Sequence, residues 1–265
     1  MVAICWNMVP GRGANPLAGR VEKGEISGAA DLAQTLINRV IRESEHQDLE
    51  GPVRIQIGLP HGKLRLEGKL RDAWLRGLPH PVLNETEASP ASSHLFLTFE
   101  VDGLVCPSFV ADFLENSHPA IGMCWTGSGA QDGETQGLLE GRAWTQNAED
   151  PENSSSWSVA HLGLRRGPDD TRPEGSDPVS ATPVIQAFRK TFRLRRSPTT
   201  PGTSLVLLEP LTGNRKGNPL RDWASAILSA YYFSLLSGSL EIQLTHGRDT
   251  VQCNRDSAQR LLDSP

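Results

Sequence analysis

A strand–helix–strand pattern in the C-terminal half constrains the fold of this sequence more than any other feature. Residues 202–208 and 239–244 are short apolar or alternating runs, which are typical of β-strands. Between them, Asn218 and Pro219 favour the start of a helix, and Gly238 favours its end. Apolar side chains cover most of the circumference of this helix, so it must be buried on more than one side. The pattern predicts a βαβ unit that anchors the C-terminal half.

Upstream of this unit, apolar periodicity predicts further helices and strands. One apolar stripe predicts a helix over residues 27–45, and strict alternation predicts a half-buried strand over 53–57. The other expected elements are strands at 63–67, 95–101 and 184–196, and short helices at 70–78 and 110–114. This order of elements predicts an α+β fold with α/β layers.

The composition of the chain varies enough along its length to suggest three parts. Residues 1–25 have no apolar period and are expected to be a tail. Residues 26–165 are expected to form a first domain, and 183–265 a smaller second one. Residues 126–182 are rich in Gly, Ser, Asp, Glu and Pro, so we expect a long loop there.

Charge and cysteine content exclude several classes of protein. The net charge of −5 argues against a protein that coats nucleic acid, although a local basic patch remains compatible with it. The four cysteines form no C-x-x-C pair, which argues against a disulfide framework or a zinc ribbon. No apolar run approaches the roughly 20 residues that span a bilayer, and no signal peptide is visible. We therefore expect a cytoplasmic protein that does not enter membranes.

Two groups of polar residues are candidates for a binding site. Gln34, Asn38 and Arg42 follow one another at helical spacing on the first helix, where a solvated helix face is the alternative explanation. Asp102 and Gly103 come directly after an apolar strand. A carboxylate at a strand end can point into a cleft, but an isolated Asp-Gly pair more often forms a simple turn.

A glycine-rich segment and a basic segment are weaker candidates. The backbone amides around Gly127 and Gly129 could hold phosphates, but the lysine of a P-loop is absent and a flexible linker explains the glycines better. Arg189, Arg193 and Arg195 would share one face of the expected strand at 184–196. Such a face could bind the phosphates of a nucleotide or of a nucleic acid, with a solvated sheet face as the alternative.

The C-terminal pattern resembles a known superfamily. The segments are Phe188–Arg195, the Pro-Gly-Thr-Ser sequence at 201–204, and the helix and strand over 226–244. They are similar to the transducer region of GHKL ATPases, the superfamily of gyrase, histidine kinases, mismatch-repair ATPases and heat-shock chaperones. The resemblance implies a GHKL-like α/β sandwich followed by a smaller transducer-like βαβ domain.

The resemblance also implies roles for the candidate residues. In these ATPases a helix carries a glutamate that polarises the attacking water and, four residues later, an asparagine that holds Mg²⁺. The matching positions here are Gln34 and Asn38, so the asparagine is kept and the base is replaced by an amide. The adenine-binding Asp-x-Gly-x-Gly motif corresponds to Asp102-Gly103, and the glycines of the lid correspond to Gly127 and Gly129.

The hypothesis from the sequence is a degenerate GHKL-like protein that binds ATP and Mg²⁺ weakly or not at all. It would act through contact with a protein partner or as a homodimer, as a subunit of a bacterial complex in defence or DNA processing. One alternative is an active ATPase in which Glu43 or Glu45 replaces the missing base. Another is a nucleic-acid-binding adaptor that uses Arg189, Arg193 and Arg195.

Overall fold

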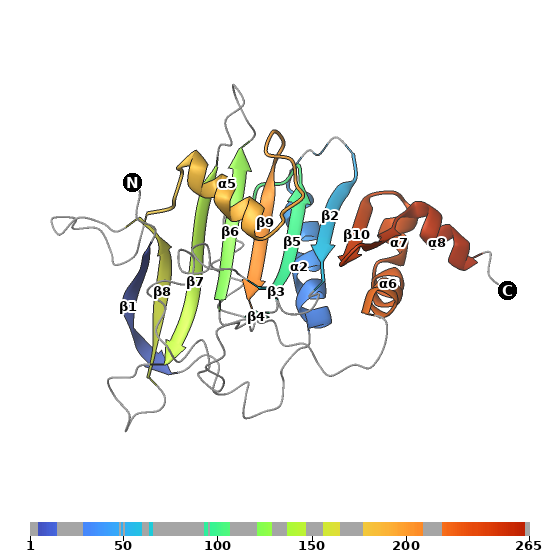
Figure 1. Ribbon diagram of the computed structural model, residues 1–265. Coiled ribbons are helices and arrows are strands. Elements are labelled where there is room, and N and C mark those ends of the chain that lie inside the picture. The colour runs from blue at the N-terminus through green and yellow to red at the C-terminus, as the bar shows by residue number, and fades with distance from the viewer. Residues whose placement is uncertain are drawn as a thin grey trace.

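The computed structural model contains one large mixed β-sheet with helices on both faces (Figure 1). It describes residues 5–14, 29–47, 49, 51–59, 64–65, 93–94, 96–106, 121–128, 137–146, 156–164, 177–208 and 219–262. The α+β class expected from the sequence is confirmed.

The elements follow one another along the chain in an order dominated by strands. The strands are β1 (Cys5–Ala14), β2 (Val53–Gly58), β3 (Leu64–Arg65), β4 (Ser93–His94), β5 (Phe96–Asp102), β6 (Ile121–Ser128), β7 (Leu138–Gln146), β8 (Ser156–Gly163), β9 (Pro201–Leu208), β10 (Leu240–His246) and β11 (Asp249–Cys253). The helices are α2 (Ala29–Ser44), α5 (Thr182–Thr191), α6 (Pro219–Ala230), α7 (Tyr232–Leu236) and α8 (Arg255–Leu262).

The nine-stranded sheet has the order β1-β8-β7-β6-β9-β5-β2-β10-β11, and β3 and β4 pair separately. Neighbouring strands are antiparallel except β2 and β10, which are parallel. It follows that β9 and β10 run in the same direction, with β5 and β2 between them. The βαβ unit predicted from the C-terminal sequence is therefore present, and its strands are joined through α6 and α7.

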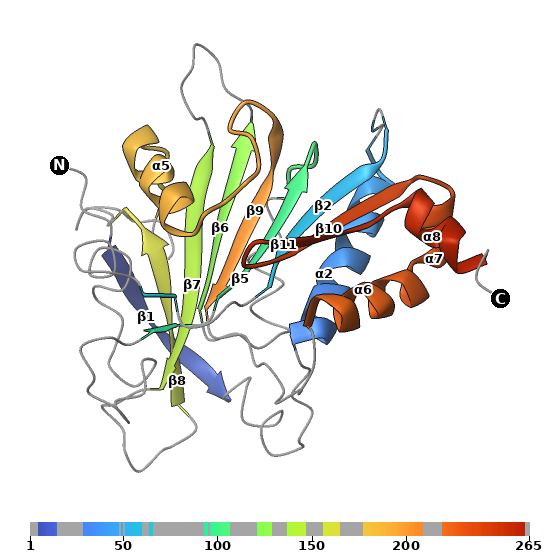
Figure 2. The ribbon, with the colours of Figure 1, turned by 45° about the vertical axis from the view of Figure 1, so that its right-hand side comes forward.

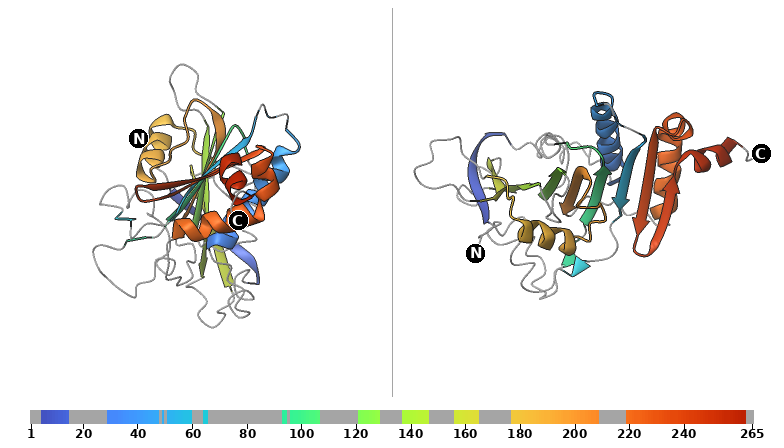
Figure 3. Two further views of the ribbon diagram at one scale, coloured as in Figure 1. Left: turned by 90° about the vertical axis from the view of Figure 1, so that its right-hand side faces the viewer. Right: turned by 90° about the horizontal axis from the view of Figure 1, so that it is seen from above.

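Two apolar cores lie on opposite faces of this sheet. On one face, α2, α6, α7 and α8 bury their apolar sides against β2, β5, β9 and β10. On the other face, α5 packs against β6 to β9. Seen from above, α2 and α5 lie on opposite sides of the sheet (Figure 3, right), and Figure 2 shows α5 across one half of it.

The alternation along β5 decides which side chains meet which helix. Leu97, Phe99 and Val101 belong to the core that contains α2. Phe96 packs on the core that contains α5, and Glu100 has its partners on that side as well. Because successive side chains of a strand point to opposite faces, Asp102 also lies on the α5 side.

The structure corrects the expected division of the chain. Part of the expected tail forms β1, and the expected loop 126–182 contains β7 and β8. β9, from the expected second domain, pairs with β5 and β6 from the first. One sheet therefore crosses the expected boundary. The strands β7 and β8 were missed because their short apolar runs are interrupted by polar residues and glycine, and pairing with neighbouring strands overrides such weak local preferences.

The structure also corrects two elements. Residues 182–191, expected within a strand, form α5, because Ile185, Phe188 and Phe192 recur at helical spacing and Pro183 suits a first helical turn. The helix expected up to Gly238 is broken at Tyr231, whose φ and ψ are −118° and 22°. The expected helices 70–78 and 110–114 lie outside the described residues.

Candidate functional site

The candidate residues of α2 contact the C-terminal helices rather than the end of β5. The Tyr231 hydroxyl, at the break between α6 and α7, lies 2.9 Å from the Asn38 Oδ1 and 3.0 Å from the Gln34 carbonyl oxygen, and its single proton can be donated to either acceptor. Tyr231 is buried, and burial raises its pKa to about 12, so its hydroxyl remains a donor at neutral pH. Asn38 thus links α2 to the βαβ unit.

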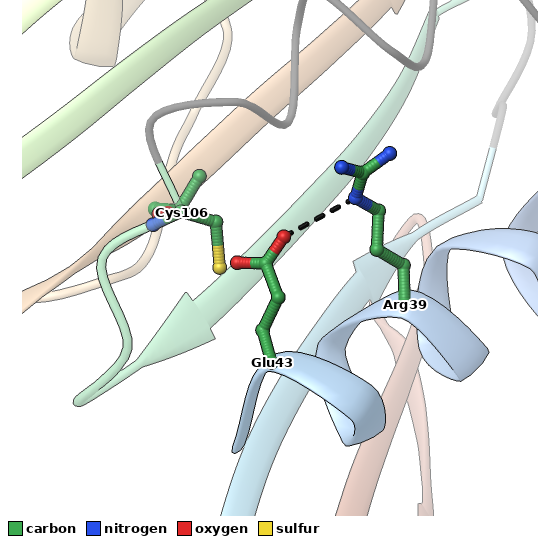
Figure 4. Close-up of polar contacts among 4 residues, drawn as sticks. Arg39, Glu43 and Cys106 are labelled. Carbon is green, nitrogen blue, oxygen red and sulfur yellow. Dashed lines mark hydrogen bonds and ion pairs between the residues drawn. The ribbon is translucent and has the colours of Figure 1, made fainter. Parts of the chain in front are cut away.

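A different pair of α2 side chains faces the segment that follows β5. Arg39 Nε lies 3.2 Å from Glu43 Oε1, and the Glu43 carboxylate lies between Arg39 and the Cys106 sulfur (Figure 4). Burial first, and then the hydrogen bond and charge of Glu43, raise the pKa of the Cys106 thiol well above its usual value. Cys106 is therefore a neutral thiol, which makes it a poor nucleophile.

The Asp102-Gly103 pair forms a turn on the opposite face. The Gln56 side chain donates to Asp102 Oδ2 at 3.1 Å. Gly103 has a φ of 81°, which favours glycine, and its amide donates to the Pro201 carbonyl oxygen at 2.8 Å. The sequence hypothesis required Asp102 and Asn38 to share one site, and the structure does not bring them together.

Gly127 lies in β6 on the α5 side of the sheet, where it meets Arg196. A Cβ atom at Gly127 would lie 2.9 Å from Trp125 Cζ2 and 3.0 Å from Arg196 Nη2. Glycine is therefore needed for close packing of these two side chains. Gly129 lies outside the described residues.

The expected basic strand face is wrong, because Arg189, Arg193 and Arg195 lie in three different settings. Arg189 belongs to α5, and its Nη2 donates to the Arg196 carbonyl oxygen at 2.8 Å. Arg193 is an exposed turn residue with a φ of 54°, and Arg195 Nη1 donates to the Thr245 hydroxyl at 3.2 Å. The shared face would have required an extended strand, which α5 replaces.

A buried polar cluster that the sequence hypothesis missed surrounds Arg196. Glu100 accepts hydrogen bonds from the backbone amides of Arg195 and Arg196, both at 2.8 Å, and from the Ser204 hydroxyl at 3.3 Å. Arg196 Nε donates to Ser204 Oγ at 3.0 Å, and the guanidinium lies 3.9 Å from the centroid of the Trp125 ring. Burial is the first cause of both pKa shifts, raising the pKa of Glu100 and lowering that of Arg196 to about 10. The only sequence signal was a charged Glu100 within an apolar strand.

The described residues do not fit Mg²⁺ and ATP at the positions that the resemblance assigned. Asn38 engages Tyr231, Asp102 lies on the other face, and Arg39 pairs with Glu43 beside the end of β5. Within the part of the chain that the structure describes, no three His, Cys, Asp or Glu side chains cluster as metal ligands would. In that same part, no helix is long and apolar enough to cross a membrane.

Comparisons with known proteins gave matches among solved structures only. The chain is similar to the 43K ATPase domain of Thermus thermophilus gyrase B, solved with an aminocoumarin, with a TM-score of 0.41 and 9% sequence identity over 95% of this chain. It is also similar to the ATP-binding domain of Francisella tularensis topoisomerase IV, solved with a small-molecule inhibitor, with a TM-score of 0.39 and 8% identity over 95% of this chain. The chain spans 56% of that gyrase chain and 99% of that topoisomerase chain. No family model matches the sequence, and no curated protein matches it.

Proposed function

We propose that this chain is a GHKL-like module that does not turn over ATP and that acts through contact with another protein or with a second copy of itself. The observation that carries the proposal is how the polar side chains of α2 are paired. Its Asn38 is hydrogen bonded to Tyr231, and its side facing the end of β5 carries the Arg39–Glu43 ion pair.

The Arg39–Glu43 pair also argues against an active ATPase that uses Glu43 as its base. A general base must be free to accept a proton from an attacking water. The Glu43 carboxylate instead pairs with Arg39 and lies against the Cys106 thiol. Glu45, the other substitute considered, is exposed just beyond the end of α2.

The proposed contact surface is formed by the C-terminal helices. Phe233 in α7 is 82% exposed, and Leu261 in α8 is 50% exposed. The Phe233 ring packs edge-on against Tyr232, with centroids 5.4 Å apart. Contiguous exposed apolar patches are typical of surfaces that bind other proteins, and we propose that Phe233 is the centre of such a patch.

A thermal-shift titration with Mg-ATP tests the nucleotide part of the proposal. A ligand present at 100 times its Kd would raise the free energy of unfolding by about 2.7 kcal/mol. We expect no saturable, Mg²⁺-dependent rise in Tm, and the same result for Asn38→Ala. A Mg²⁺-dependent rise that Asn38→Ala removes would overturn the proposal.

Sedimentation of the wild-type chain and Phe233→Ser tests the contact part. If a second copy is the partner, the wild-type chain sediments as a concentration-dependent dimer and Phe233→Ser as a monomer. Ser234→Ala, a neighbouring change on the same helix, is the control and should sediment like the wild type. A dimer that persists in Phe233→Ser would refute this surface.

A further inference from the structure

Three buried hydrogen-bond donors without partners gather around one indole ring. Among the described residues, Trp125 Nε1, Arg189 Nε and Arg196 Nη2 are buried and make no hydrogen bond. Arg196 and Trp125 are fully buried, and the guanidinium carbons of Arg196 and Arg189 lie 3.9 Å and 5.1 Å from the Trp125 centroid. The three donors therefore belong to one cluster.

Two glycines pack closely against these donors, and neither position has room for a side chain. A Cβ atom at Gly137 would lie 2.6 Å from Trp125 Nε1 and 2.9 Å from the Cα of Gly127. A Cβ atom at Gly127 would lie 3.0 Å from Arg196 Nη2. Trp125 Nε1 and Arg196 Nη2 thus border the same pair of glycines.

The acceptors in the neighbourhood are used by other donors. Both carboxylate oxygens of Glu100 accept hydrogen bonds from the backbone amides of Arg195 and Arg196. The Asp102 carboxylate attracts Arg196 at longer range, but its hydrogen bond comes from Gln56. The Glu100 and Asp102 carboxylates therefore leave the three orphaned donors unmatched.

Such an arrangement is costly unless an acceptor completes it. A buried donor without a partner costs roughly 1–3 kcal/mol, and more when it is charged. Native proteins leave few such groups, and each requires an explanation. A carboxylate or phosphate group offers several acceptor oxygens and a charge opposite to that of the two guanidinium groups.

We propose that Trp125, Arg189 and Arg196 form a binding site for a small oxyanion, either a phosphate or a carboxylate group. Trp125 Nε1 and the free nitrogens of the two guanidinium groups donate to its oxygens. The site lies on the α5 side of the sheet, away from α2, so it does not depend on the function proposed above.

The test measures unfolding of the full chain in inorganic phosphate and in acetate, each against chloride at equal ionic strength. Phosphate stabilises many proteins without binding to a site, so the variants decide the result. Arg189→Gln and Trp125→Phe each remove one of the donors. Arg193→Gln is the matched control, because Arg193 is exposed in the turn after α5.

We expect a saturable rise in Tm with phosphate, acetate or both for the wild type and for Arg193→Gln. In Arg189→Gln the apparent affinity should fall at least about tenfold, which corresponds to the roughly 1.4 kcal/mol of one charged hydrogen bond. A response to phosphate alone assigns a phosphate ligand, and a response to acetate alone a carboxylate. If Trp125→Phe does not fold, Arg189→Gln alone decides. The proposal is overturned if both anions act like chloride, or if Arg189→Gln responds like Arg193→Gln.

Discussion

The neighbouring tyrosines at the α6–α7 break provide a matched pair for testing the role of Asn38. The Tyr231 hydroxyl can donate its single proton to Asn38 Oδ1 or to the Gln34 carbonyl oxygen, whereas the buried Tyr232 hydroxyl has no partner among the described residues. Tyr231→Phe should therefore remove a real link between α2 and the βαβ unit. Tyr232→Phe removes only an orphaned polar group.

The expected magnitudes follow from these partners. A hydrogen bond contributes about 0.5–1.5 kcal/mol net, and the exposed Asn38 can regain a bond to water, so Tyr231→Phe should lower the free energy of unfolding by about 1 kcal/mol. For a chain of this size that corresponds to a fall in Tm of roughly 2–4 °C. Tyr232→Phe should leave the free energy unchanged or raise it.

Chemical denaturation of Tyr231→Phe, Asn38→Ala and the double variant measures the coupling between the two side chains. Independent sites add to within about 0.3–0.5 kcal/mol, so we expect a coupling above that range and no larger than the roughly 1 kcal/mol of Tyr231→Phe itself. Additive effects, or equal losses in Tyr231→Phe and Tyr232→Phe, would refute the assignment of Asn38 to a structural link.

Three further predictions concern other residues. Gly103→Ala should lower the free energy of unfolding by about 1–2 kcal/mol, because Gly103 has a φ of 81°. Nothing lies within 4 Å of an added Cβ, so the loss would come from the backbone conformation alone. An unchanged free energy of unfolding in chemical denaturation would contradict this. Burial raises the pKa of Tyr231 from 10.0 to about 12, so the folded state holds this proton more tightly than the unfolded state does. The free energy of unfolding of the wild type should therefore decline between pH 10 and about pH 12, and that of Tyr231→Phe should decline less. The thiols of Cys106, Cys124 and Cys253 are buried and have raised pKa values. Peptide mapping after iodoacetamide treatment should therefore find these three cysteines unmodified in the native protein and alkylated in the denatured protein.

Strongly periodic segments could be predicted from the sequence. The helix at 27–45, the strands at 53–57 and 95–101 and the βαβ unit all correspond to elements of the structure. In each, local preference and burial agree, and such agreement makes a pattern reliable. The strands β7 and β8 could not be predicted, because pairing with their neighbouring strands in the sheet stabilises them more than their own composition does.

The candidate site was harder to predict than the fold, because it depends on which way side chains point. Residues such as Asn38 and Asp102 were grouped by motif, yet α2 and β5 direct them to different faces. Conversely, no sequence pattern singles out Arg196, and only the packing of β9 and α5 around Trp125 shows that it is buried. The spacing of residues shows which of them share a face of one helix or strand, but not which face of a neighbouring element they contact.

Calorimetric titration of Mg-ATP into the wild-type chain and Asn38→Ala tests the central claim most directly. The account predicts no Mg²⁺-dependent heat of binding for either protein. An anion held by Arg189 and Arg196 would bind without Mg²⁺ and equally well in Asn38→Ala, so it cannot be mistaken for the nucleotide site. Saturable Mg²⁺-dependent binding that is lost in Asn38→Ala would contradict the account.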